Sequence, residues 1–417
     1  MPDMEIMINE FVAQLTKRKI EGSQATARLT AELLRTVVSQ QRLPPTNQAM
    51  ALIEAVRGVG ERLISANPVE LAVGNIVRRV LHIIREENFS VLTSDTGNLN
   101  LSAETDDEDT DEQDNCSVPS VAALAARNVL RAPSLHALLE TMPNSAVACT
   151  EEKSNFFLKR IVMSYSFPAE KFARSRKLKL DVIEAVNELI DDIDTCHEQI
   201  SEQAVEHIHQ NKVILTLGRS RTVLEFFCAA KQKQRSFRVF VAEGAPRYQG
   251  HVLAKELVAR GVQTTLITDS AVFSLVSRVN MVLVGAHAVM ANGGIIAPIG
   301  LNMVALAARK YAVPFVVVAG IHKLCPLYPH DPEVSLNGMR SPSELLEFGK
   351  FSANMEFGMG SGAPLLHVVN PAFDYVPPEL VNLLITDVGG HNPSYMYRLI
   401  ADYYSADDFV LQRKSTS

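Results

Sequence analysis

Four short segments in the second half of the chain contain side chains that could do chemistry. His287 has a ring that titrates near neutral pH and Asp269 could supply a carboxylate, so the two could act as acid and base. The turn Gly218-Arg219-Ser220 precedes a helical pattern and could present backbone N–H groups to an anion. Glu243 and Asn292 add an acid and an amide from the two other segments. Proton transfer and anion binding are the two chemistries that these residue types allow.

Each segment also has a purely structural interpretation. An ordinary turn capped by Ser220 explains the first segment, because a single glycine turn does not match the GxGxxG pattern of nucleotide-binding loops. Asp269 could cap a helix. A lone histidine in an apolar loop, such as His287, is more often a core residue with its hydrogen bonds satisfied. The residue types alone leave these alternatives open.

Strands and helices alternate around these segments. Runs rich in Val, Ile, Leu and Phe predict strands, and apolar residues at helical spacing predict helices between most of them. The alternation predicts a parallel sheet covered on both faces, with ligands beyond the carboxyl ends of its strands. We therefore expect a Rossmann-like α/β domain over residues 206–417. Its predicted strands are Val213–Leu217, Phe237–Ala242, Gln263–Thr268, Val279–Val284, Pro314–Ala319 and Pro364–Val369, and its predicted helices include Thr222–Lys231, His251–Ala259 and Asn302–Lys310.

In the first half of the chain, apolar residues recur at helical spacing, and no stretch shows the residue alternation that is typical of strands. We expect a helical domain over residues 1–205 with a disordered acidic insert at about 94–119, since that segment has too few apolar residues to pack. An acidic tail that binds a basic partner is the alternative.

Phenylalanines alternate with lysines and arginines in residues 153–179. This pattern predicts packed helices with a cationic outer face. A contact with phosphate or RNA is the alternative. The helical patterns cover Met4–Lys19, Ser23–Val38, Asn47–Leu63, Pro68–Arg85, Ser134–Leu139 and a connecting helix, Leu180–His209.

Composition excludes several classes of protein. The 417 residues are 47% apolar, which suits a large core in two domains. The formal net charge of −7 comes largely from the acids between Glu104 and Asp114, and it argues against nucleic acid as a direct partner. The five cysteines have no CxxC spacing, which indicates a reducing, cytoplasmic setting without structural zinc. The N-terminus lacks the pattern of a signal peptide.

One stretch, Val279–Ala308, contains no Asp, Glu, Lys or Arg. Its asparagines, glycines and proline would leave polar groups unpaired in lipid, which argues against a membrane span. It predicts a buried strand, a glycine-rich loop and a buried helix.

The C-terminal stretch 370–387 reads NPAFDYVPPELVNLLITD and predicts a strand exit, a proline-stiffened corner, a short helix and a second strand-like run. It resembles a motif shared by the methylthioribose-phosphate isomerases and the regulatory subunits of eukaryotic translation initiation factor 2B. The four segments described above, around Gly218, Glu243, Asp269 and His287, occur in the order and approximate spacing of four motifs of that family. In its isomerases these motifs read LTHCNAG, ETRPxxQG, ITD and GADRIxxNG. The resemblance covers nearly the whole chain apart from the acidic insert. It implies an N-terminal helical domain followed by a Rossmann-like domain of the isomerase-related type.

The resemblance also implies which positions an isomerase would need. In those isomerases a cysteine of the first motif and an aspartate of the fourth move protons, and an arginine precedes the proline of the second. This chain has Gly218, His287 and Ala245 there, and Arg219 does not titrate near neutrality. The resemblance therefore implies no catalytic, cofactor-binding or metal-binding residues. It implies a vestigial pocket of Gly218, Arg219, Ser220, Glu243, Ala245, Asp269, His287 and Asn292.

The implied function is that of a non-catalytic regulatory subunit in a guanine-nucleotide exchange factor. Such a factor recycles GDP-bound initiation factor 2 to its GTP form, and its regulatory core senses phosphorylation of the alpha subunit of that substrate. The implied partners are alpha, gamma, delta and epsilon subunits and initiation factor 2 as substrate GTPase, with no cofactor, no direct nucleic acid contact and no membrane. The uncharged surface around Met290–Met303 and Phe357–Leu366 is expected to contact other subunits. The alternatives are a sugar-phosphate isomerase with a relocated site at His287 and Asp269, and a vestigial pocket that binds a regulatory ligand.

Overall fold

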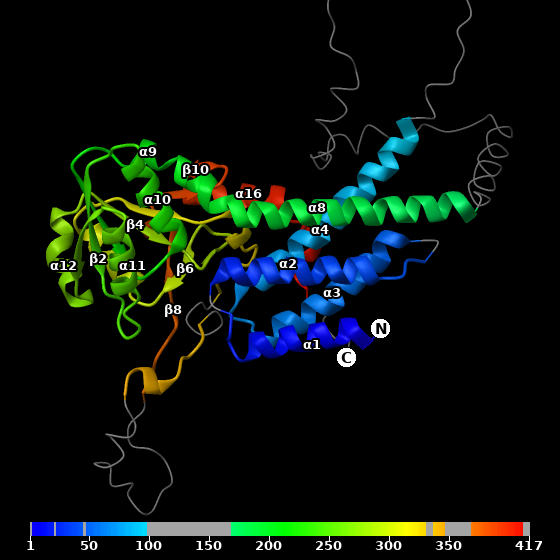
Figure 1. The fold of residues 1–417 in the computed structure, drawn as a ribbon, viewed down its shortest axis with the longest axis horizontal. Coiled ribbons are helices and arrows are strands. Elements are labelled where there is room, and N and C mark those ends of the chain that lie inside the picture. The colour runs from blue at the N-terminus through cyan, green and yellow to red at the C-terminus, as the bar shows by residue number, and fades with distance from the viewer. Residues whose placement is uncertain are drawn as a thin grey trace, which may run out of the picture. The chain divides into compact units, whose positions relative to one another are not determined.

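The computed structural model describes residues 2–20, 22–44, 47–97, 168–330, 337–346 and 368–411 (Figure 1). The chain forms two compact units, one from Met1–Val91 with Arg174–Ser417 and the other from Leu92–Ala173. The elements below belong to the first unit, except for the ends of two helices that continue into the second. The predicted domain boundary at residue 205 stays a prediction.

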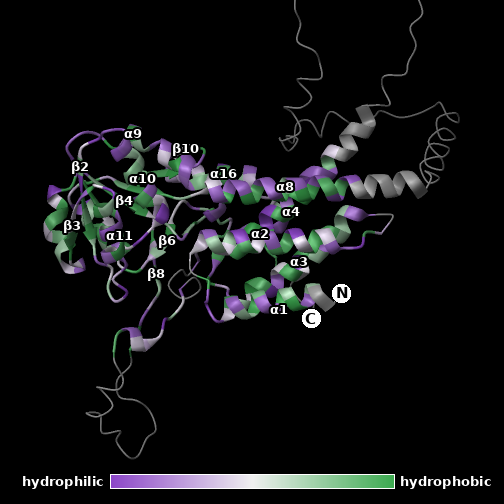
Figure 2. Ribbon diagram, in the orientation of Figure 1, coloured by the Kyte–Doolittle hydropathy of each residue, from purple (hydrophilic) through white to green (hydrophobic). Residues whose placement is uncertain are grey.

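Amphipathic helices make up the first part of the chain, as the spacing of its apolar residues predicts. Their buried faces share one core, in which Leu34, Leu52, Ile76 and Val182 are fully buried. Figure 2 shows polar and apolar residues interleaved along each of these helices. The helices are α1 (Pro2–Thr16), α2 (Ser23–Gln40), α3 (Gln48–Ala66), α4 (Leu71–Gly97) and α8 (Pro168–Glu202).

Helix α4 is longer than the sequence predicts. It continues to Gly97, so the expectation of disorder is wrong for residues 94–97, because no proline or glycine lies between Gly74 and Gly97. The rest of the acidic insert lies outside the described residues, as do Ser134–Leu139 and 153–167.

The expected connecting helix Leu180–His209 is interrupted. α8 ends at Glu202 and a short helix, α9 (Ala204–His207), follows. The backbone N–H of Gln203 donates to Ile200 O, and its side chain donates to Thr386 O at 2.7 Å. These bonds replace the regular helical pattern and join the end of α8 to the sheet.

A seven-stranded sheet forms the centre of the α/β part, in the order β10-β9-β7-β4-β1-β2-β3. Every neighbouring pair is parallel except β9–β10. The chain runs outward from β1 to β3 and then returns to β4 on the other side of β1, which creates a switch point of the kind where doubly wound sheets bind ligands. The predicted Rossmann-like architecture is confirmed. The strands are β1 (Lys212–Leu217), β2 (Phe237–Ala242), β3 (Gln263–Ile267), β4 (Met281–Gly285), β7 (Phe315–Val318), β9 (Leu383–Thr386) and β10 (Gly389–His391).

Helices cover both faces of this sheet, as right-handed crossovers require. On one face, Phe226 and Leu253 share a core with Leu283, and on the other, Val304 and Ile400 share a core with Val282. Successive residues of β4 thus point to opposite buried faces, which explains why the strands read as continuous apolar runs. The helices are α10 (Arg221–Gln232) and α11 (Gln249–Ala259) on the first face, and α12 (Val272–Leu275), α13 (Leu301–Lys310) and α16 (Met396–Tyr403) on the second.

A second, antiparallel sheet is absent from the sequence prediction. It consists of β5 (Ala288–Val289), β6 (Ile295–Pro298) and β8 (Phe373–Val376), in the order β5-β6-β8. β5 and β6 are too short to give a clear alternation and replace the expected loop. The turn between them needs Gly293, whose φ is +82°, because a Cβ there would lie 2.3 Å from Pro393 O.

The C-terminal motif folds as its residues predict. β8 ends at Val376, the 3-10 turn η5 spans Pro378–Leu380, and β9 begins at Leu383. Of the expected strand Pro364–Val369, residues 368 and 369 are described and lie outside any strand. Within the described ranges, no helix is both long and apolar enough to span a membrane.

Candidate functional site

The four segments singled out by their chemistry meet at one edge of the large sheet. β1 to β4 are mutually parallel through the pairs β1–β2, β2–β3 and β1–β4, so their carboxyl ends lie on the same side. Gly218 follows β1, Glu243 follows β2, Asp269 lies just beyond β3, and His287 lies two residues beyond β4. The contacts of each side chain decide what this edge can do.

Asp269 binds the neighbouring loop. Its two carboxylate oxygens accept hydrogen bonds from the backbone N–H groups of Gly244, at 2.9 Å, and of Ala245, at 2.8 Å. The N-cap of its own 3-10 turn is Thr268, so Asp269 is not the expected helix cap. Ala245 contributes only an exposed methyl group at this loop. The carboxylate therefore fixes the loop after β2.

Ser220 and Arg219 have structural partners as well. Ser220 is the N-cap of α10 and accepts from Val223 N, which agrees with the structural interpretation of this segment. A Cβ at Gly285 would lie 2.6 Å from Ser220 Oγ, so the Ser220 side chain packs directly against Gly285 at the end of β4. Arg219 Nη2 donates to Glu256 Oε1 on α11 at 2.7 Å, and this hydrogen bond raises the pKa of Arg219. Both side chains are thus engaged with neighbouring residues of the fold.

Glu243 and Asn292 also serve the fold. His251 Nε2 lies 3.5 Å from Glu243 Oε2, which pairs the loop after β2 with α11. Asn292 donates from Nδ2 to the Tyr375 hydroxyl at 2.7 Å and accepts from Gly294 N at 3.0 Å. These two bonds fix the turn between β5 and β6 against β8.

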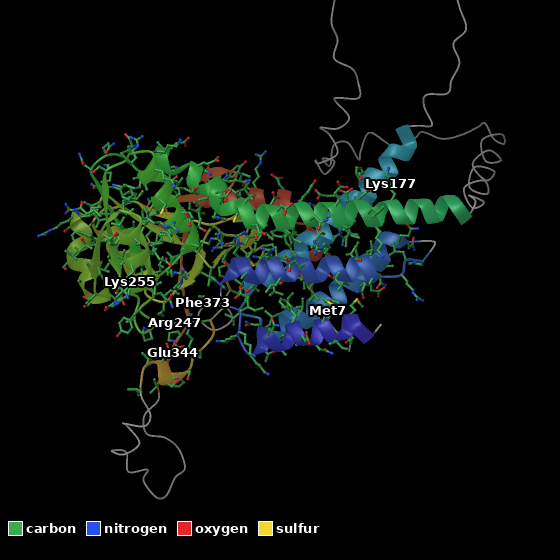
Figure 3. The ribbon with its side chains drawn as sticks, viewed as in Figure 1. Met7, Lys177, Arg247, Lys255, Glu344 and Phe373 are labelled. Carbon is green, nitrogen blue, oxygen red and sulfur yellow. The ribbon has the colours of Figure 1, made fainter. Side chains whose placement is uncertain are left out.

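His287 is in a different environment from Asp269. Its ring stacks on Phe373, which is labelled in Figure 3, with centroids 4.4 Å apart. Its Nε2 lies 3.5 Å from Oε1 of Glu70, the residue before α4. Burial lowers the pKa of His287, so the ring is neutral at physiological pH. No hydrogen bond or ion pair joins His287 to Asp269 in the described part of the chain. The structure therefore does not assemble the acid–base pair that a relocated isomerase site would need.

Sequence analysis missed a buried polar group where the helices meet the end of β7. Asn75 of α4 donates to His322 O at 3.3 Å, and Lys323 Nζ donates to Ala286 O at 3.0 Å. Burial lowers the pKa of His322 to about 3 and that of Lys323, and it raises the pKa of Cys196 to about 11. His322 and Lys323 lie three and four residues beyond the predicted strand Pro314–Ala319, and the other four segments also follow predicted strands, so the same reasoning could have found them.

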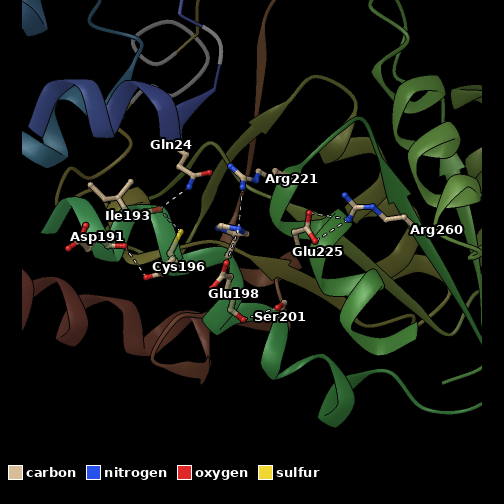
Figure 4. Close-up of polar contacts among 11 residues, drawn as sticks. Gln24, Asp191, Ile193, Cys196, Glu198, Ser201, Arg221, Glu225 and Arg260 are labelled. Atoms are coloured by element: carbon tan, nitrogen blue, oxygen red, sulfur yellow. Dashed lines mark hydrogen bonds and ion pairs between the residues drawn. The ribbon is translucent and has the colours of Figure 1, made fainter. Parts of the chain in front are cut away.

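Helix α8 connects the helical part to the sheet through polar contacts that Figure 4 shows. Arg221 Nη2 lies 3.3 Å from His197 Nε2, which links α10 to α8. Gln24 Nε2 donates to Ile193 O at 2.9 Å, which links α2 to α8. These contacts hold α2 and α10 against α8. No cluster of three or more His, Cys, Asp or Glu suited to a metal ion occurs in the parts of the chain that the structure describes.

The expected contact surface around Met290–Met303 is largely buried. Met290 and Ile295 are fully buried in the small sheet and its surroundings, so this prediction is wrong for them, because β5 and β6 pack against the core. Met303 is exposed on α13. Phe357–Leu366 lies outside the described residues.

The sequence is similar to known translation factors over almost its whole length. The model of the Initiation factor 2 subunit family matches residues 19–393. Translation initiation factor eIF2B subunit beta of Dictyostelium discoideum is 39% identical over 96% of this chain and 95% of its own length. The protein of the same name from Schizosaccharomyces pombe is 36% identical, over 97% of both chains.

The sequence identity to isomerases and to proteins of solved structure is lower. Ribose 1,5-bisphosphate isomerase of Archaeoglobus fulgidus is 31% identical over 58% of this chain and 72% of its own length. The crystal structure of eIF2B beta from Chaetomium thermophilum superposes with a TM-score of 0.67 at 24% identity, covering 98% of this chain and 96% of that one. The tetrameric eIF2B-beta2-delta2 complex from the same organism gives 0.62 at 24% identity, covering 96% and 95%. These structures confirm the fold.

Proposed function

The chain belongs to the Initiation factor 2 subunit family, and we propose that it is a non-catalytic regulatory subunit, of the beta type, of the guanine-nucleotide exchange factor for initiation factor 2. The observation that supports this most is the match to a beta subunit over 96% of this chain and 95% of the relative. Its partners would be the alpha, gamma, delta and epsilon subunits, with initiation factor 2 as the substrate GTPase. It would work in the cytoplasm and help to sense phosphorylation of the alpha subunit of the substrate.

The geometry at the strand ends supports a role without chemistry. Asp269 is held by two backbone N–H groups, and Arg219 is held by Glu256. His287 is stacked on Phe373, and its Nε2 lies 3.5 Å from Glu70 Oε1 without a hydrogen bond to any described residue. Asp269 and Arg219 therefore have partners within the fold, and the Ser220 hydroxyl lies against Gly285 at the end of β4. We propose that the residues at this edge are a vestigial pocket.

Co-expression with the other four subunits tests the proposal. The chain should purify in one complex with them, as measured by the mass of the native complex. That complex should release GDP from initiation factor 2, and phosphorylation of the substrate's alpha subunit should slow the release. A chain that stays alone in the presence of all four partners would contradict the proposal.

An isomerase is the second candidate, because the Archaeoglobus enzyme is 31% identical over 58% of this chain. Incubation with ribose-1,5-bisphosphate or methylthioribose-1-phosphate should give no ketose product. Turnover that disappears in both His287→Ala and Asp269→Asn would establish a relocated site. Turnover that survives both changes would point to a contaminating enzyme.

A further inference from the structure

Two histidines that follow strands of the large sheet lie against the start of α4. Nε2 of His287 lies 3.5 Å from Oε1 of Glu70, and Asn75, five residues later, donates from Nδ2 to the backbone oxygen of His322 at 3.3 Å. Nε2 of both rings, Oε1 of Glu70 and Oδ1 of Asn75 are buried and form no hydrogen bond with any residue that the structure describes. We call Glu70, Asn75, His287 and His322 the α4 latch.

The latch lies where α4 passes from one core to another. Leu71, the first residue of α4, belongs to the core of the small sheet together with Ala288 and Cys325. From Ala72 onward, the helix buries its side chains in the core of the helical part. Buried polar atoms without a hydrogen-bond partner are rare in native proteins and cost free energy. The start of α4 is therefore held to the strand ends by a contact of low stability.

The surroundings of the two rings oppose a positive charge. At His287, burial has the largest effect and lowers the pKa. Glu70 favours the protonated ring there, whereas Lys323 and Arg340 disfavour it. At His322, burial and the charge of Lys323 lower the pKa to about 3. Both rings are therefore neutral while the latch is closed at neutral pH.

The other charged or titratable groups near the latch do not compensate for this. Burial raises the pKa of the Cys196 thiol to about 11, so the thiol is uncharged beside the His322 ring. Asp387 accepts a hydrogen bond from the backbone N–H of Ile321 at 2.9 Å. Arg78, three residues after Asn75, adds a further positive charge.

We propose that the α4 latch is a proton-controlled contact, in which proton uptake by His287 and His322 releases the start of α4 from the strand ends in mild acid. This inference is independent of the proposed function. When the contact opens, water solvates the charged rings and the unpartnered atoms, so the open state binds protons more tightly. The closed contact is then fully stable above pH 6.5 and loses stability as the pH falls below this value.

Hydrogen exchange of the full chain at pH 7.5 and pH 5.5, corrected for the intrinsic rates, tests the latch. Exchange of residues 67–75 and 286–291 should quicken at pH 5.5 by up to about tenfold for each histidine, while β1 stays slow. His287→Gln with His322→Gln should remove this response, because glutamine does not titrate. His209→Gln is the control, since His209 is exposed and lies outside the latch. A double variant that responds like the unmodified chain, or equal quickening in β1, would overturn the inference.

Glu70→Gln tests the direction of the effect and leaves both rings in place. Glu70 favours the protonated ring of His287 in the closed contact, so its loss should widen the difference in proton affinity between the two states. The quickening of exchange between pH 7.5 and pH 5.5 should therefore increase. Glu54→Gln, an exposed position on α3, should respond like the unmodified chain. A smaller response in Glu70→Gln, or slower exchange of the unmodified chain in acid, would show that protonated His287 pairs with Glu70 and closes the contact, which would overturn the inference.

Discussion

Asp269 shows how a carboxylate at the end of a parallel strand can serve the fold instead of a reaction. Its position beyond β3 is one where ligands of such sheets are bound, yet both of its oxygens accept backbone hydrogen bonds from the loop after β2. Arg219 and Asn292 are likewise engaged, with Glu256 and Tyr375. A polar residue at a strand end is therefore a candidate for chemistry only after its partners are known.

We expect Asp269→Ala to lower the free energy of unfolding by about 2 kcal/mol, because it leaves two backbone N–H groups without their acceptor. Asp269→Asn keeps one carbonyl oxygen and should cost less. Urea unfolding measures both, and Ser270→Ala serves as the control, since its side chain bonds only to Thr268 among the residues described. Equal stability of the Ala variant and this control would contradict the assigned role.

The buried histidines predict a loss of stability in mild acid. Burial lowers the pKa of His322 to about 3, whereas an unfolded histidine titrates near 6.5, so the unfolded chain binds more protons between these values. Stability should fall as the pH drops below about 6.5, and by pH 5 His322 alone should contribute a loss of roughly 2 kcal/mol. Unfolding at pH 7.5 and pH 5 should show a smaller difference for His322→Gln than for the unmodified chain. An unchanged pH slope in that variant would refute the assignment.

Among the elements, the C-terminal segment joins the helices to the sheet. Asp408 is fully buried and accepts from Arg57 Nη2 at 2.6 Å and from Arg85 Nε at 3.0 Å. Leu411 then enters the helical core, while Ile400 of α16 stays in the core of the sheet. This short stretch thus contributes to both cores.

Asp408→Asn should lower the free energy of unfolding by about 3 kcal/mol, because it removes the carboxylate shared by two partly buried arginines. Asp407→Asn is the matched control, since Asp407 is 74% exposed and pairs only with Arg85 in the described chain. Hydrogen exchange should quicken in α3 and α4 of the Asp408 variant and stay slow in the central strands. Similar losses in the two variants would show that burial of Asp408 is unimportant.

Two glycines should respond oppositely to alanine. At Gly250 a Cβ would lie 2.1 Å from Ala242 O, so Gly250→Ala should cost about 2 kcal/mol by forcing α11 away from β2. At Gly58, inside α3, nothing lies within 4 Å of the added Cβ, and alanine should stabilise the helix by up to about 1 kcal/mol. Thermal unfolding of both variants checks the prediction, which is wrong if the two shifts have the same sign.

For the molecule as a whole, the important property is a Rossmann-like sheet whose polar side chains at the strand ends contact other parts of the chain. Ser220 packs against Gly285 at the end of β4, and His287 Nε2 lies 3.5 Å from Glu70 Oε1 in the helical part. Such an arrangement suits a scaffold that presents surfaces to partners.

The isolated chain should accordingly leave the rate of GDP release from initiation factor 2 at its spontaneous value. A fluorescent GDP analogue measures this, with the complete complex as the positive control. Acceleration by the isolated chain would contradict the proposal that it is a non-catalytic subunit.

The sequence by itself determined the class of fold and the places where chemistry could occur. Apolar runs of five or six residues separated by helical patterns specify a parallel sheet, and most strand boundaries agree within two residues. It could not determine β5 and β6, because two short strands stabilised by β8, some 75 residues later, have no local signal. The sequence also could not show that His322 and Lys323 lie in one buried group with Asn75, because Asn75 is far from them in the chain.

Only the tertiary structure decided which polar residues are partners. Asp269 and His287 follow strands of the same sheet, yet the Asp269 carboxylate accepts hydrogen bonds from a neighbouring loop, whereas the His287 ring lies against Glu70, more than 200 residues earlier in the chain. Hydrogen bonds and burial depend on distances of a few ångströms between segments remote in sequence. The sequence therefore fixes what a side chain can do, and the packing around it decides what it does.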